Sequence, residues 1–73
     1  MENIGIRACK EIYSRMDFDH DLDDICFEID LSRASLYQYR KGKIVPSAKV
    51  LQRMALAGYD VIYILTGERK NND

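Results

Sequence analysis

Histidine and cysteine are scarce in this chain of 73 residues, and their scarcity excludes several kinds of site. The single histidine, His20, has no cysteine near it at the spacing of zinc ligands, and its acidic surroundings offer no nucleophile–base pair. Cys9 and Cys26 do not form a Cys-x-x-Cys pair, and each lies among apolar residues at helical spacing. We therefore expect two buried free thiols, no metal, no cofactor, no small-molecule ligand and no enzymatic activity.

A long apolar run is also missing. The longest one, Val61 to Leu65, has five residues, whereas a membrane-spanning helix needs about 18 or more. The N-terminus lacks the basic-then-apolar layout of a secretion signal, so we expect a cytoplasmic protein with no membrane contact. The length suits one domain. Such a small domain buries only about 60% of the surface that its unfolded chain exposes, which favours a dimer.

Charge is segregated along the chain, although the formal net charge is only −1. Residues 1–30 carry nine acids and three bases, whereas residues 31–59 carry six bases and no acid. The six bases are Arg33, Arg40, Lys41, Lys43, Lys49 and Arg53. Solubility alone is served by interspersed signs, so the segregation predicts one negative face and one positive face. The positive face suits a polyanion such as nucleic acid.

Apolar periodicity and capping residues predict five helices and no strand. Asp21 and Ser32 stand at expected helix starts, where short polar side chains cap the backbone, and Gly42 and Gly58 follow expected helix ends. The expected helices are Asn3–Met16, 22–29, Ser32–Arg40, the segment between Pro46 and Gly58, and Asp60–Leu65. This pattern predicts one all-α domain over residues 1–67, followed by a frayed tail over residues 68–73.

The helix expected over residues 32–40 has two different sides. At 100° per residue, one set of side chains spans an arc of about 140°, while Leu36 and Tyr39 lie opposite, toward the core. The outward set is Arg33, Ala34, Tyr37, Gln38 and Lys41. Arginine can form two hydrogen bonds to guanine, glutamine can pair with adenine, and alanine can approach a thymine methyl group. Lys41, Lys43 and Tyr37 suit the phosphate backbone.

Two short helices separated by about three residues are typical of a helix-turn-helix, here with its core over residues 22–40. Residues 22–67 resemble the helix-turn-helix domain of phage repressors and Cro proteins, the lambda repressor-like or XRE-like type. The most specific parts are LSRASLYQYRKGK at 31–43, the Pro46-Ser47 helix start and GYDVIYILTGE at 58–68.

The resemblance implies a compact five-helix lambda repressor-like domain. It also implies a homodimer that binds inverted-repeat operators in double-stranded DNA and represses or switches nearby promoters, often in phages, prophages or other mobile elements. The matching positions imply base contacts from Arg33, Ala34 and Gln38, capping or phosphate contacts from Ser32 and Ser35, and phosphate contacts from Lys41 and Lys43.

This sequence departs from the family pattern at two positions and in one stretch. Asp30 replaces a common turn glycine, and Leu22 stands where a polar, phosphate-contacting residue is frequent. Five aspartates lie between residues 17 and 24, close to the expected path of the DNA backbone. Such an acidic cluster weakens non-specific binding, and it can sharpen specificity by repelling duplexes in the wrong register.

Two further interpretations concern protein partners. Helix five is too apolar for a fully exposed end, which predicts a two-fold dimer contact, although a lone surface leucine at position 56 is also an ordinary feature. The expected contact residues are Leu56, Tyr59, Ile62 and Tyr63. In the alternative function, the acidic stretch 17–30 binds a basic partner such as a toxin, a polymerase or another regulator, and DNA binding is weak.

Overall fold

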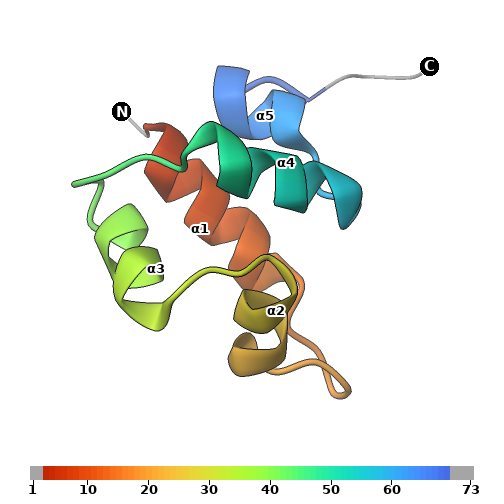
Figure 1. Ribbon diagram of the computed structural model, residues 1–73. Helices are drawn as coiled ribbons and strands as arrows, with labels where there is room; N and C mark the ends of the chain where they lie inside the picture. Colours follow the sequence, from red (N-terminus) through yellow and green to blue (C-terminus); the bar gives the residue numbers. More distant parts are fainter. Residues whose placement is uncertain (1–2, 70–73) are drawn as a thin grey trace.

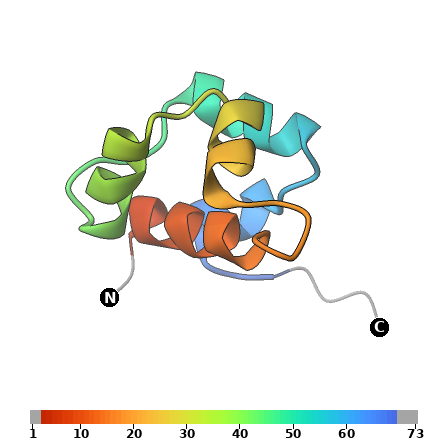
Figure 2. The same cartoon turned by 90° about the horizontal axis from the view of Figure 1, so that it is seen from below.

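The computed structural model describes residues 3–69, and within that range it contains five α-helices and no strand (Figure 1). The helices are α1 (Ile4–Ser14), α2 (Leu22–Glu28), α3 (Arg33–Arg40), α4 (Ala48–Leu56) and α5 (Val61–Thr66). The expected all-α class is confirmed. α1 lies in the middle of the fold, with α3 beside its N-terminal half and α2 beside its C-terminal end (Figures 1 and 2).

Each helix begins at a short polar residue whose side chain accepts a hydrogen bond from a backbone N–H three residues later. These N-caps are Asn3, Asp21, Ser32, Ser47 and Asp60. The expected caps at Asp21 and Ser32 are confirmed, and Asp21 forms a reciprocal capping box with Asp24. α1 ends at Ser14, two residues before the expected end at Met16, and Met16 is exposed. Local hydrogen bonding therefore sets the helix boundaries.

One apolar core joins all five helices. Ile12, Ile29, Met54 and Ile64 are its largest fully buried side chains. Further members are Ala8, Cys9, Leu22, Ile25, Cys26, Leu31, Leu36, Tyr39 and Tyr59. Cys9 and Cys26 are free and buried, as expected, and burial raises the pKa of both thiols.

The start of α1 and the end of α3 are held together by a close backbone approach. Gly5 is buried, and a Cβ atom there would collide with the backbone carbonyl oxygen of Ile44. The Asn3 side chain donates a hydrogen bond from Nδ2 to the carbonyl oxygen of Gly42 at 2.9 Å. Because both contacts involve backbone, they fix where α3 ends relative to α1.

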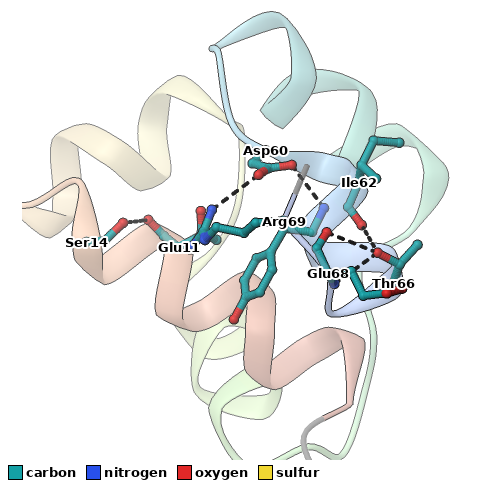
Figure 3. A network of polar contacts seen from close by, with 8 residues as sticks. Glu11, Ser14, Asp60, Ile62, Thr66, Glu68 and Arg69 are labelled. Atoms are coloured by element: carbon teal, nitrogen blue, oxygen red, sulfur yellow. Dashed lines mark hydrogen bonds and ion pairs between the residues drawn. The ribbon is translucent and has the colours of Figure 1, made fainter. Parts of the chain in front are cut away.

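Glu68 and Arg69, the first two residues of the expected tail, contact other parts of the fold (Figure 3). Arg69 places Nη2 2.6 Å from Oε2 of Glu11 and Nη1 3.2 Å from Oδ2 of Asp60. Its guanidinium also lies 4.0 Å from the centre of the Tyr63 ring. The Glu68 N–H donates to the Thr66 hydroxyl at 3.1 Å. These contacts tie the segment after α5 to α1; residues 70–73 of the expected tail lie outside the described residues.

The turn between α2 and α3 contains a left-handed residue that is not glycine. Asp30 has a φ of 56°, which is unfavourable for a side chain with a Cβ atom, although aspartate tolerates it better than most residues. Its neighbours Ile29 and Leu31 are buried on either side. The chain therefore turns through the left-handed region between two side chains that both belong to the core.

This geometry predicts how stability responds at position 30. Asp30→Gly and Asp30→Ala both remove the carboxylate, but only alanine retains the steric cost of the left-handed conformation. We expect the glycine variant to have an unfolding free energy higher than that of the alanine variant by about 1 kcal/mol. Urea denaturation followed by circular dichroism measures the difference. Equal stability of the two variants would contradict the assigned backbone conformation.

Candidate nucleic-acid interface

α2 and α3 are joined by a short turn, and both helices pack against α1. The turn is fixed by a hydrogen bond from the Leu31 N–H to the carbonyl oxygen of Cys26, at 2.9 Å. α3 buries Leu36 and Tyr39 against the core, as expected from their phase, and turns its opposite side to solvent. Leu22, at the start of α2, is buried in the core. The Leu22 side chain is therefore part of the core and does not supply the polar group that is frequent at that position.

Most of the side chains expected to contact DNA are exposed. The exposed ones are Ser32, Arg33, Ala34, Tyr37, Lys41 and Lys43. Ser35 and Gln38 are half-buried. The Ser32 hydroxyl oxygen accepts a hydrogen bond from the Ser35 N–H at 3.0 Å and lies 3.0 Å from the Ser35 hydroxyl. These two serines therefore serve the helix start itself.

Arg33 is engaged by an acidic residue of α2. Its Nη1 lies 2.6 Å from Oδ1 of Asp23, and this hydrogen bond raises the pKa of the guanidinium. Both side chains are exposed, so the pair contributes little to stability. The pair affects the orientation of Arg33. One side of the guanidinium group is held toward α2, which restricts the directions in which its remaining N–H groups can donate hydrogen bonds.

The remaining bases of residues 31–59 differ in how they are neutralised. Arg53 lies 3.7 Å from the Asp30 carboxylate, and Lys41 lies 4.8 Å from the centre of the Tyr37 ring. Within residues 3–69, no acid forms an ion pair with Arg40, Lys41, Lys43 or Lys49. The positive charge left uncompensated therefore concentrates at the end of α3, in the following loop and at the start of α4.

Arg40 is a candidate residue that the sequence analysis missed. It is exposed, and it lines a hollow of about 260 Å³ together with Arg33 and Tyr37. Its spacing of seven residues from Arg33, close to two helical turns, was the available signal. Arg40 thus extends the cationic side of α3 toward α1.

The four residues expected at a dimer contact differ widely in how far they are exposed. Leu56 is 83% exposed and Ile62 is 57% exposed. Tyr63 is half-buried beneath Arg69. Tyr59 is only 6% exposed in the single chain, which leaves little of its surface for a partner. Tyr59 packs in the core because it follows Gly58, whose φ of 89° turns the chain back over the protein, and Arg15 stacks on its ring at 3.9 Å.

The acidic stretch borders a separate hollow of about 400 Å³ between the end of α1, α2 and Tyr59. Its lining includes Asp17, Asp24 and Glu28 alongside His20 and Arg15. Two aromatic side chains of this region, Phe18 and Phe27, are almost completely exposed and were not expected as surface residues. Phe27 falls outside the apolar phase of α2, which was the available signal.

The described part of the chain contains neither a candidate metal site nor a candidate membrane-spanning helix. Across residues 3–69, no three histidine, cysteine, aspartate or glutamate side chains are grouped so that they could hold a metal ion. The helices of this segment are all too short or too polar to cross a bilayer. Comparisons with protein-family models, curated proteins and solved structures found no match.

The contact between His20 and Asp17 makes a prediction about pH. Nδ1 of His20 lies 2.9 Å from Oδ1 of Asp17, and this hydrogen bond raises the pKa of the imidazole, with smaller contributions from Asp19 and Asp24. The imidazolium is favoured in the folded state. The resulting stabilisation is therefore complete below the unfolded pKa of about 6.5 and is lost as the pH rises through the folded value.

We expect an NMR titration of the His20 ring to have its midpoint above about 6.5. Asp17→Asn should move the midpoint down, while Glu68→Gln should leave it unchanged. A wild-type midpoint at or below that of Asp17→Asn would show that the pair does not form in solution.

Proposed function

We propose that this protein is a sequence-specific double-stranded DNA-binding transcriptional regulator, a repressor of the phage, prophage or mobile-element type. In this proposal α2 and α3 form a helix-turn-helix of the phage repressor and Cro type, and α3 enters the major groove. The observation that carries the proposal is the outward side of α3, where Arg33, Ala34, Tyr37 and Lys41 are all exposed.

The side chains of this surface divide into two roles. Arg33, Ala34 and Gln38 contact base edges, through guanine, a thymine methyl group and adenine respectively. Ser32, Ser35, Tyr37, Lys41 and Lys43 face the phosphate backbone, and Arg40 joins them. The concentration of uncompensated charge at the end of α3 supports this division, because a cation that no carboxylate neutralises is available to pair with a phosphate.

The regulator acts as a homodimer on an inverted repeat, with Leu56 and Ile62 as the apolar contact residues. Their exposure supports this assignment, since side chains of this kind gain most from being covered. Binding of the dimer across a promoter would block transcription by occupancy.

A second candidate function uses the acidic surface of residues 17–30 to bind a basic protein partner. The hollow beside Asp17, Asp24 and Glu28, together with the exposed Phe18 and Phe27, favours it. The two functions make opposite predictions for DNA affinity: the second predicts weak binding without base preference.

Selection of bound sequences from a random duplex pool tests the proposed function. We expect an inverted repeat whose half-site centres are separated by about one helical turn, 34–36 Å. Affinity for the selected site should fall by about 10³–10⁵ between 50 and 200 mM salt if the dimer neutralises about 6–10 phosphates. Recovery of no preferred sequence would reject the proposed function.

Side-chain substitutions separate base contacts from phosphate contacts on the selected site. Arg33→Ala or Gln38→Ala should cost about 1–3 kcal/mol of binding free energy and relax the preference at one base pair. Lys41→Ala should weaken all duplexes alike and reduce the salt slope by about 1. Unchanged affinity in both the Arg33 and the Gln38 variants would show that α3 does not contact bases.

The pair between Arg33 and Asp23 predicts a separate effect on specificity. Asp23→Asn removes the carboxylate that restrains Arg33, and it also removes a negative charge that opposes the DNA backbone. We expect tighter binding to unrelated duplexes and a weaker preference at the base pair contacted by Arg33. Competition binding with the selected site and a scrambled duplex measures both.

Asp24→Asn is the matched control, because Asp24 lies in the same helical turn but does not contact Arg33. It should strengthen binding to both duplexes by a similar factor and leave the preference intact. Identical changes in the Asp23 and Asp24 variants would reduce the role of Asp23 to simple charge repulsion.

A further inference from the structure

A hollow of about 390 Å³ lies between α1 and α3, outside the acidic surface. Its lining residues are Ile6, Cys9, Lys10, Tyr13 and Arg40. The two helices lie side by side in both views of the fold (Figures 1 and 2). A second hollow of about 260 Å³, beside Arg33, is also lined by Tyr13 and Arg40, so the two hollows adjoin at these side chains, and we call the pair the groove.

The charge of the lining is one-sided in a protein whose net charge is −1. Lys10 and Arg40 line the first hollow, and no carboxylate lines either hollow. The Arg40 side chain makes no hydrogen bond, ion pair or ring contact with the residues that the structure describes. Its positive charge acts on the Cys9 thiol in the groove: burial raises the pKa of this thiol, and Arg40 partly offsets that rise.

The rest of the lining is apolar or aromatic. Ile6 and Cys9 form the floor, and the ring of Tyr13 is partly exposed beside them. An apolar floor beneath a guanidinium that lacks a partner is complementary to a molecule with an anionic head and an apolar tail. The volume is at the lower end of the range of about 300–1,000 Å³ that is usual for small-molecule sites.

We propose that this groove binds a small organic carboxylate with an apolar tail, and that its occupation opposes DNA binding. The carboxylate pairs with the Arg40 guanidinium, for which a planar two-oxygen anion is the best geometric match. The tail lies over Ile6 and Cys9 and against the Tyr13 ring. No covalent step is involved.

The effect on DNA rests on the proposed function. Arg40 borders the same hollow as Arg33 and Tyr37, so a ligand that neutralises it also removes a phosphate-facing charge from α3. A bound carboxylate additionally places a negative charge beside the DNA backbone. Ligand and duplex therefore bind antagonistically, and by linkage the duplex weakens ligand binding by the same factor.

The first experiment measures ligand binding to the intact protein without DNA. Sodium octanoate is titrated into ¹⁵N-labelled protein, with octylammonium chloride and octanol as chain-matched probes of opposite and zero charge. We expect saturable amide shifts confined to residues 6–13 and 33–41 with octanoate, and much weaker shifts with the other two. Equal shifts from all three, or shifts spread through the core, would overturn the proposed site.

Variants then test the assigned contacts. Arg40→Gln should weaken octanoate binding by about tenfold, the equivalent of one charge-assisted hydrogen bond. Tyr13→Ala should weaken it through loss of the tail contact, with circular dichroism confirming the fold. Met16→Ala, at an exposed position beyond the groove, should leave it unchanged. Octanoate affinity that is insensitive to Arg40→Gln would contradict the proposal.

The last step adds the selected duplex. At an octanoate concentration that saturates the wild-type protein but leaves most of the Arg40→Gln variant unoccupied, duplex binding should weaken for the wild type and change much less for the variant. If octanoate binds and duplex affinity is unchanged, the antagonism is wrong. If no duplex is selected at all, the proposed function fails, and the ligand titration still decides the site independently.

Discussion

The packing of α3 against α1 is the constraint on which the rest of the candidate interface depends. α3 is only eight residues long, too short to be stable alone in water. Leu36 and Tyr39 bury one side of it, and the contact of Gly5 with the Ile44 carbonyl fixes its end. Because the buried side is determined by packing, the exposed side is determined as well. The same contact creates the groove in which Arg40 lies.

The charge distribution is more connected in the folded protein than the sequence suggests. Arg33 and Arg53 cross from the basic part of the chain to Asp23 and Asp30 of the acidic part. Both pairs are solvent-exposed and therefore stabilise the fold only slightly. Their main effect is to restrict the further contacts of the two arginines, because an arginine paired with a carboxylate is less available to bind a phosphate. Such restraint favours selective binding over tight non-specific binding.

The sequence analysis predicted features that depend on residues close together in the chain. It did not predict contacts between residues that are far apart in the chain. The caps at Asp21 and Ser32 are local features of this kind. Tyr59 is buried in a core that all five helices share, with Arg15 stacked on its ring, and Arg69 contacts Glu11, 58 residues away. Composition and periodicity do not encode such pairs, because many surface arginines and tyrosines have the same local surroundings.

Because Tyr59 is buried within the single chain, a dimer contact would have to rely on other side chains. Two exposed apolar side chains, Leu56 and Ile62, provide far less area than the roughly 1,200–2,000 Å² buried in stable protein interfaces. A contact built on them is weak between free molecules. On DNA, adjacent half-sites raise the effective concentration of one subunit near the other, and a weak contact then suffices. Within the proposed function, operator DNA is therefore the element that assembles the dimer, and the spacing of the half-sites becomes part of the specificity.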